Sequence, residues 1–258
     1  MSEGIYQRKN VPVFEAIYGK GFISLGGAQA VRNMFDGYNL KNKSVLDIGF
    51  GLGGLLYLIV SEYEANGIGL DTQSWMTDYA LEAAPNKIQG SLKFYTYIPD
   101  CAFPLEDCSV NMVVSKGVLT NIKNKEKLFS EIYRILKPSG EILLIDWIVP
   151  DYIGQYSSVL TMGDESHKET ESSYRKILED NGFSQIRFTN VSKEYLTYVE
   201  QLDTLYRSDE HRETFKEVID DDLRVRLTEA NQKLLRSIKK GKQLACKIEA
   251  STYKRNIS

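Results

Sequence analysis

The sequence predicts an α/β fold, with a mostly parallel β-sheet and helices on both of its faces. Three observations support this prediction. Through most of the chain, short apolar runs alternate with helical patterns, as in proteins whose parallel strands are joined by crossover helices. Residues 110–115 are almost entirely apolar, as expected of a central strand that is covered on both faces. Residues 126–136 place Leu128 and Ile132 at helical spacing, which predicts an amphipathic helix.

The predicted elements follow one another in a regular order. Lys-Pro-Ser-Gly at residues 137–140 ends one helix, and Gly182 ends another. The expected strands are residues 45–49, 65–71, 92–98, 110–115, 141–147, 185–191 and 246–253. The expected helices are residues 55–63, 75–84, 126–136 and 170–181. We expect a single domain over residues 1–258, with an N-terminal leader over residues 1–30 and a helical cover over residues 193–243, inserted before the last strand.

Composition excludes several classes of function. The chain has 258 residues and a formal net charge of -3, from 32 Lys and Arg against 35 Asp and Glu. A balance this close to neutral argues against a dedicated nucleic-acid binder. The two histidines, His167 and His211, have no partners at ligand spacing, and we expect both at the surface. The cysteines form no CxxC pair, so neither a zinc site nor a disulfide framework is expected: Cys101, Cys108 and Cys246.

No targeting signal is evident in the sequence. The first residues contain no apolar core like that of a signal peptide. The longest apolar runs are far shorter than the roughly 20 residues that a membrane span needs. Three Asn-x-Ser sequons, at Asn42, Asn190 and Asn256, are therefore taken as coincidence. We expect a cytoplasmic protein that does not bind a membrane.

A glycine-rich turn joins the first expected strand to the first expected helix. It reads Asp-Ile-Gly-Phe-Gly-Leu-Gly-Gly over residues 47–54. Glycine lets the backbone turn sharply and approach a ligand closely, and the next helix offers free N–H groups at its N-terminus. Asp71 ends the next strand, where an acid can accept hydrogen bonds from a ribose diol. This combination predicts a nucleotide-containing cofactor.

Two cofactors fit the turn. A dinucleotide uses Gly-x-Gly-x-x-Gly, which the first, second and fourth glycines provide, and S-adenosylmethionine uses acid-x-Gly-x-Gly-x-Gly, which begins at Asp47. The acid favours S-adenosylmethionine, because the charged amino group of that cofactor needs an anionic or carbonyl partner. After the third expected strand, Asp100 can accept from an adenine amino group, and the N–H of Cys101 can donate to the ring.

The chain resembles the class I S-adenosylmethionine-dependent methyltransferases. Val-Leu-Asp-Ile-Gly-Phe-Gly-Leu-Gly at residues 45–53 is similar to their cofactor motif. Arg-Ile-Leu-Lys-Pro-Ser-Gly-Glu-Ile-Leu-Leu at residues 134–144 is similar to the segment that leads into their fifth strand. The resemblance covers roughly residues 30–190. It implies a Rossmann-like seven-stranded sheet in the order 3-2-1-4-5-7-6, with the seventh strand antiparallel.

A narrower resemblance includes the leader. Residues 13–27 are similar to the leader of the phosphoethanolamine N-methyltransferases. This implies that the leader folds over the cofactor, with Ile23 and Ser24 at the methionine end and Phe14 in the same pocket. Tyr6 aligns with the Tyr of that family's catalytic Tyr–His pair. The expected cofactor-binding residues are Phe14, Ile23, Ser24, Asp47, Gly49, Gly51, Gly53, Asp71, Thr72, Asp100, Cys101, Ser115 and Lys116.

The substrate half departs from that family. Lys116 and Gly117 stand where the family has Arg-Asp, and Asn121 stands where it has the catalytic His. Tyr6 and Asn121 are the expected catalytic residues, and Asn121 would orient an amine or a water rather than act as a base. Aromatic rings and a carboxylate at the end of the fifth strand could hold a methylated ammonium. The expected substrate-binding residues are Asp146, Trp147, Tyr152 and Tyr156.

These observations predict an S-adenosylmethionine-dependent methyltransferase that acts on a small molecule, with an amine nitrogen as the leading acceptor. Methylation of oxygen or carbon in a small natural product is the alternative within this class. A non-catalytic cofactor-binding relative is a second alternative, because the family's His is absent. A nicotinamide-dependent oxidoreductase is a more distant one, because the glycine string also fits a dinucleotide. None of these functions requires a metal or a nucleic-acid partner.

Overall fold

The computed structural model describes residues 6–153, 156–159 and 165–253 of the chain. Within these residues the main sheet has seven strands, in the order β3-β2-β1-β4-β5-β9-β8. The strands are β1 (Ser44–Ile48), β2 (Asn66–Asp71), β3 (Leu92–Thr96), β4 (Val110–Lys116), β5 (Leu136–Ile148), β8 (Phe183–Asn190) and β9 (Leu244–Thr252). β9 is antiparallel to both β5 and β8, and the other pairs are parallel. Counted along the chain, this is the order 3-2-1-4-5-7-6, so the predicted Rossmann-like fold is confirmed.

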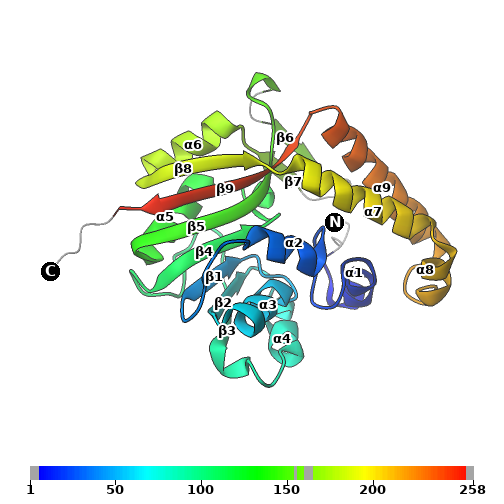
Figure 1. Ribbon diagram of the computed structural model, residues 1–258, viewed down its shortest axis with the longest axis horizontal. Coiled ribbons are helices and arrows are strands. Elements are labelled where there is room, and N and C mark those ends of the chain that lie inside the picture. The colour runs from blue at the N-terminus through cyan, green and yellow to red at the C-terminus, as the bar shows by residue number, and fades with distance from the viewer. Residues whose placement is uncertain (1–5, 154–155, 160–164, 254–258) are drawn as a thin grey trace.

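Helices cover both faces of the sheet (Figure 1). The helices are α1 (Val11–Tyr18), α2 (Gly27–Met34), α3 (Gly54–Tyr63), α4 (Ser74–Ala83), α5 (Lys125–Ile135), α6 (Glu171–Asp180), α7 (Ser192–Arg207), α8 (Asp209–Thr214) and α9 (Asp221–Lys239). α2, α3 and α4 pack on one face of the sheet, and α5 and α6 pack on the other. Alternation along each strand supplies both cores, because successive side chains point to opposite faces. In β1, for example, Val45 belongs to the first core and Leu46 to the second.

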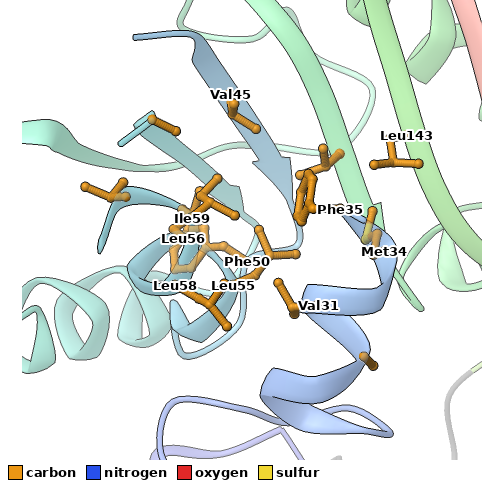
Figure 2. Close-up of a cluster of buried hydrophobic side chains, with 14 of the residues drawn as sticks. Val31, Met34, Phe35, Val45, Phe50, Leu55, Leu56, Leu58, Ile59 and Leu143 are labelled. Carbon is orange, nitrogen blue, oxygen red and sulfur yellow. The ribbon is translucent and has the colours of Figure 1, made fainter. Parts of the chain in front are cut away.

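Figure 2 shows the core on the first face. Val31 from α2, Leu56 from α3, Phe50 of the glycine turn and Val45 of β1 belong to this one cluster. Leu56 and Val45 have no exposed surface. Full burial of such a side chain contributes about 1.5–3 kcal/mol relative to exposure. The strand ends that carry the turn are therefore fixed by the best-packed part of the molecule.

Local signals set the starts of two helices on the second face. The side chain of Asn124 accepts a hydrogen bond from the Lys127 N–H at the start of α5, and Thr170 does the same for the Ser173 N–H at the start of α6. Capping of this kind satisfies an N–H that the helix itself leaves unpaired, and it contributes about 1 kcal/mol. Both helices begin within a residue of where the sequence places them.

The structure corrects the predicted start of the fifth strand. The sequence predicts a strand from residue 141, but β5 already begins at Leu136, directly after α5. Leu136 pairs with Val110, and the register with β4 shifts before the next pair. Ser139 takes up this shift with a φ of 58°, in the left-handed region. A bulge of this kind lets the strand run through the Lys-Pro-Ser-Gly segment, and the helix ends at Ile135, one residue earlier than predicted.

Two features were not predicted. A small hairpin follows β5, formed by β6 (Tyr156–Val159) and β7 (Glu165–Lys168). In the leader, α1 and α2 are helical, although the sequence analysis assigned no helix there. The hairpin strands are short and carry several polar residues, so they show no clear alternation of apolar side chains. Both features form by packing on distant parts of the chain.

The segment between β8 and β9 contains α7, α8 and α9, which we call the helical cover. α7 and α9 lie side by side and extend past the edge of the sheet (Figure 1). α1 of the leader packs against this cover through Ile17, which meets Leu202 and Leu227 in one apolar cluster. Within the described residues, no helix is both long and apolar enough to cross a membrane.

Candidate functional site

The glycine turn follows β1 and leads into α3. Gly49 and Gly51 have φ values of 73° and 59°, in the left-handed region that favours glycine. A Cβ atom on Gly49 would lie 2.5 Å from the Val118 side chain, and one on Gly51 would lie 2.6 Å from Ile23 of the leader. The turn is therefore enclosed by the leader and by the loop after β4. The absence of side chains at these two positions lets Ile23 and Val118 pack directly on the backbone of the turn.

Two buried carboxylates lie beside the turn, at the ends of β1 and β2. Asp71 accepts hydrogen bonds from the Gly51 N–H at 3.1 Å and from the Gln73 N–H at 3.0 Å. Burial raises the pKa of Asp71. Burial also raises the pKa of Asp47 well above its usual range, and the negative charge of Asp71 adds to that effect. This pair can stabilise an ammonium group or the hydroxyl groups of a ribose, both of which donate hydrogen bonds to carboxylates.

A cavity of about 480 Å³ opens beside the turn, at the carboxyl ends of the parallel strands. We call it the first cavity. Its walls combine the leader, the turn, the end of β2, the loop after β3 and the end of β4. The structure brings together in its lining the expected residues Tyr6, Ile23, Ser24, Asp47, Gly49, Asp71, Thr72, Asp100, Cys101, Lys116 and Asn121.

The remaining expected cofactor residues support this cavity from behind. Gly51 donates its N–H to the carboxylate of Asp71, and Gly53 precedes α3 with a φ of 89°. Ser115 is fully buried, and its hydroxyl donates to a carbonyl oxygen of β1 at 2.8 Å. Phe14 is buried beneath the half-exposed ring of Tyr6, with the ring centroids 5.9 Å apart.

The leader is tied to the sheet side of the cavity by hydrogen bonds. The carbonyl oxygen of Gly21 accepts from the N–H of Gly54, at the N-terminus of α3, at 2.9 Å. The carboxylate of Glu15 accepts from the Gly21 N–H at 2.9 Å and from the Tyr79 hydroxyl of α4 at 2.8 Å. These hydrogen bonds therefore fix the described part of the leader in place as one wall of the first cavity.

Lys116 links the end of β4 to the leader. Its ammonium group donates to the Ser24 hydroxyl at 2.8 Å and to the Leu25 carbonyl oxygen at 2.7 Å. Burial lowers the pKa of Lys116 to about 8, although the negative charge of Asp47 acts in the opposite direction. Near neutral pH this amine is still mainly protonated, and its uncharged fraction grows as the pH rises toward its pKa. A titratable group thus lies between Asp47 and the leader.

Two of the expected substrate residues border a second cavity, of about 250 Å³, on the other side of Lys116. Trp147 packs edge to face against Tyr195 of α7, with the ring centroids 5.7 Å apart. Asp146 is almost fully buried, and its two carboxylate oxygens accept from the Thr120 N–H at 3.1 Å and from the Tyr174 hydroxyl at 2.8 Å. The Asp146 carboxylate thus holds the loop after β4 and α6 against β5.

The other two expected substrate residues do not join this group. Tyr152 is 81% exposed and is absent from the described lining of both cavities. Tyr156 is the first residue of β6, and its side chain lies outside the described part of the chain. Sequence analysis also missed Met76 and Phe103, which add apolar surface to the first cavity. No motif marks them, because they differ from ordinary core residues only in their position.

The prediction that His211 lies at the surface is wrong. The side chain is 6% exposed and lies between the carbonyl oxygen of Ala16, 3.3 Å from Nε2, and the guanidinium of Arg224, 3.1 Å from Nδ1. Burial lowers the pKa of His211. The packing of α8 against the leader causes this burial, and no local pattern reveals it. Within the described residues, no group of three or more His, Cys, Asp or Glu side chains is placed to hold a metal ion.

Comparison with known families agrees with this geometry. Residues 46–144 match a sequence family described as "Methyltransferase domain". This part of the chain is therefore similar to methyltransferase domains. The matched region runs from β1 through the glycine turn and Asp71 into β5. It favours the methyltransferase interpretation of the glycine string over the dinucleotide one.

Curated relatives carry the narrower resemblance. Phosphoethanolamine N-methyltransferase 3 of Arabidopsis thaliana is 27% identical over 231 residues, which are 83% of this chain and 45% of the relative. Phosphoethanolamine N-methyltransferase of Plasmodium falciparum is 32% identical over 148 residues, which are 55% of this chain and 53% of the relative. The predicted resemblance is therefore confirmed. The chain spans about half the length of these curated relatives.

A solved structure shows the same architecture. Phosphoethanolamine N-methyltransferase 2 of Haemonchus contortus, solved with phosphomonomethylethanolamine and S-adenosylhomocysteine, superimposes with a TM-score of 0.84. The alignment covers 97% of this chain and 58% of that chain, at 22% sequence identity. At this identity the likeness shows a shared fold.

Proposed function

We propose that this protein is an S-adenosylmethionine-dependent methyltransferase that methylates the nitrogen of a small-molecule amine. The observation that carries the proposal is the first cavity, where the glycine turn, Asp47, Asp71 and Ser24 of the leader meet. The methyltransferase domain match supports the reaction class. The names of the relatives, which specify N-methylation of a phosphorylated amine, support the choice of nitrogen.

The residues of the first cavity fit this cofactor by their chemistry. Gly49 of the glycine turn lines the first cavity without a side chain, which suits a ligand that approaches the main chain. Asp71 uses part of its hydrogen-bonding capacity on two backbone N–H groups and retains lone pairs for a ribose diol. Asp47 suits the cationic amino group, because a cation would favour its ionised form. In this assignment the leader, residues 1–30, covers the cofactor, and residues 193–243 cover the acceptor end within a single domain.

The reaction needs alignment more than it needs an acid or a base. When bound, S-adenosylmethionine supplies an electrophilic methyl group: the nitrogen lone pair forms the bond to carbon while the sulfur–carbon electron pair returns to sulfur. Positioning of the acceptor by the protein can account for much of the rate acceleration. Trp147 borders the acceptor side, and Tyr6 and Asn121 line the first cavity, where we assign them to orienting the amine.

The acceptor nitrogen must be uncharged to attack, and it loses a proton to water after the new bond forms. No histidine belongs to the described lining of either cavity. Lys116 offers a different means of keeping the amine neutral. A like charge and a low-dielectric environment both lower the pKa of a neighbouring amine. An acceptor amine that is buried near Lys116 is therefore shifted toward its neutral, nucleophilic form without a dedicated base.

Isothermal titration with S-adenosylmethionine and with S-adenosylhomocysteine tests cofactor binding. Gly51→Ala should weaken both by about tenfold or more, which corresponds to ~1.4 kcal/mol, because the new methyl group would strike Ile23 and displace the leader wall of the first cavity. Gly37→Ala is the matched control, since Gly37 has a φ of 80° but no other atom within 4 Å of where its Cβ would lie. No binding at millimolar cofactor would overturn the proposal, as would thermal stabilisation by NAD alone.

Release of S-adenosylhomocysteine across a panel of small amines, phenols and carbon acids tests the acceptor atom. Turnover with amines supports N-methylation. Turnover confined to phenols or carbon acids would favour the alternative chemistry. Cofactor binding without turnover across the whole panel would indicate a non-catalytic relative.

A further inference from the structure

The second cavity lies between the ends of β5 and β9 and the helices α7 and α9 of the helical cover. It meets the first cavity at Ser24, Lys116 and Gly117, which line both. These residues form a wall common to both cavities, so a molecule in the second cavity lies against the boundary of the first. This arrangement is the one that a methyl acceptor needs, because its nucleophile must lie close to the methyl donor while the rest of it lies elsewhere.

The walls of the second cavity are mainly aromatic and aliphatic. Four aromatic side chains contribute to them: Tyr18, Trp147, Tyr195 and Tyr206. Aliphatic side chains complete them: Leu25, Ile145, Leu202, Leu227, Ala230, Leu234 and Ala245. Surfaces of this kind bind apolar groups, which gain free energy on leaving water, and they bind flat rings by edge-to-face contacts.

Charged groups are scarce in this lining. Among its described residues only Lys116 and Asp146 carry a charge. The Asp146 carboxylate already accepts from Thr120 and Tyr174, and the Lys116 ammonium already donates to two oxygens of the leader. A phosphate group requires several charge-assisted hydrogen bonds to offset the cost of leaving water. The described walls offer it one cation, which is already engaged.

We propose that the second cavity receives the carbon part of the methyl acceptor, and that the acceptor is therefore a hydrophobic, ring-bearing amine rather than a phosphorylated one. This inference rests on the proposed function. The amine nitrogen lies toward Lys116 and the first cavity, and the ring lies among Trp147, Tyr195 and Leu227. Apolar surroundings and the neighbouring Lys116 both favour the neutral amine, so the same walls that select the ring also prepare the nucleophile.

Filling the second cavity tests this assignment. Ala230 lies on α9, is partly exposed and lines the cavity, so Ala230→Trp adds an indole there with little disturbance of the core. Val225→Trp is the matched control, because Val225 lies on the same helix with 56% of its surface exposed. Ala230→Leu is a milder second variant. Each variant is first titrated with S-adenosylhomocysteine, which reports on folding and on the first cavity.

The acceptor probes are benzylamine, phenethylamine and tryptamine, compared with phosphoethanolamine, each added to the full chain with saturating S-adenosylhomocysteine and measured by ligand-observed NMR. We expect at least one aromatic amine to bind at least tenfold more tightly than phosphoethanolamine does. This should hold both for the unmodified protein and for the Val225→Trp variant. Ala230→Trp should weaken that amine by tenfold or more, and Ala230→Leu should weaken it less, while S-adenosylhomocysteine affinity stays within twofold.

Three results would overturn the inference: tighter binding of phosphoethanolamine, no binding of any aromatic amine, or an aromatic amine whose affinity is unchanged in Ala230→Trp. In each case, retained binding of S-adenosylhomocysteine shows that the cofactor proposal survives. Failure of the proposed function has a different signature, which is the absence of S-adenosylhomocysteine binding in the unmodified protein.

Discussion

Lys116→Met tests the central electrostatic feature of the site, a buried amine between two cavities. Lys116 is 8% exposed and sits at the end of β4. Burial lowers its pKa from 10.5 to about 8. Methionine keeps an unbranched side chain of similar length and removes the charge. The substitution therefore separates the cost of burying an ammonium group from the packing of its aliphatic part.

The sign of the expected effect follows from proton linkage. Between the folded and unfolded pKa values of Lys116, the unfolded chain binds the proton more tightly, so the folded state gains stability as the pH rises through that window. Each unit of pKa difference corresponds to about 1.4 kcal/mol. Because a pKa of about 8 leaves the folded amine largely neutral by pH ~9.5, the contribution of Lys116 should improve by roughly 2 kcal/mol from pH ~7 to pH ~9.5.

Chemical denaturation of both proteins at the two pH values measures this contribution. Other titrating groups are common to both, so the difference in the free energy of unfolding isolates Lys116. As the pH rises, the free energy of unfolding of the unmodified protein should increase by about 2 kcal/mol relative to that of Lys116→Met. Lys93→Met, at an exposed position on β3, serves as the control. An equal difference at both pH values would refute the reasoning, and would mean that the oxygens of Ser24 and Leu25 fully compensate the buried charge.

Two further substitutions test the neighbouring packing. Tyr195→Phe should raise the free energy of unfolding by about 1 kcal/mol, because the Tyr195 hydroxyl is buried without a hydrogen-bond partner within the described structure; a loss of stability in urea denaturation would show that this hydroxyl is satisfied. Asp146→Asn should lower the free energy of unfolding by about 2 kcal/mol, because the amide nitrogen replaces one of the two oxygens that accept from the Thr120 N–H and the Tyr174 hydroxyl and leaves a buried donor unpaired. A change in melting temperature too small to match that loss would mean that Asp146 does not anchor β5 to its neighbours.

The parts of the fold that the sequence predicts are those encoded by local patterns. The glycine turn is visible because a left-handed backbone at Gly49 and Gly51 requires glycine. The central strand β4 is visible because burial on both faces demands a nearly continuous apolar run, whereas β8 is visible through alternation. Strand order is not local, and it came from the resemblance to the class I methyltransferases.

The parts that could not be predicted depend on contacts between distant segments. His211 has an ordinary polar context in sequence, and its burial follows from the packing of α8 against the carbonyl oxygen of Ala16. Asp146 looks like a ligand-binding acid at a strand end, yet its oxygens are used by Thr120 and Tyr174. Nor does any pattern show that α7 and α9 leave a cavity above Trp147. Each of these depends on how the leader and the helical cover meet the sheet.

The two cavities share a wall, which would couple the ligands that we propose for them. Ser24 and Lys116 line both cavities, and the hydrogen bond between them fixes the leader over the end of β4. A ligand that changes the charge state of Lys116 or displaces Ser24 in one cavity changes the surface presented to the other. Thermodynamic coupling of this kind is reciprocal, so a cofactor that strengthens acceptor binding must itself bind more tightly when the acceptor is present. The Lys116–Ser24 contact offers a direct physical route for that coupling, because the two residues are hydrogen-bonded to each other and line both cavities.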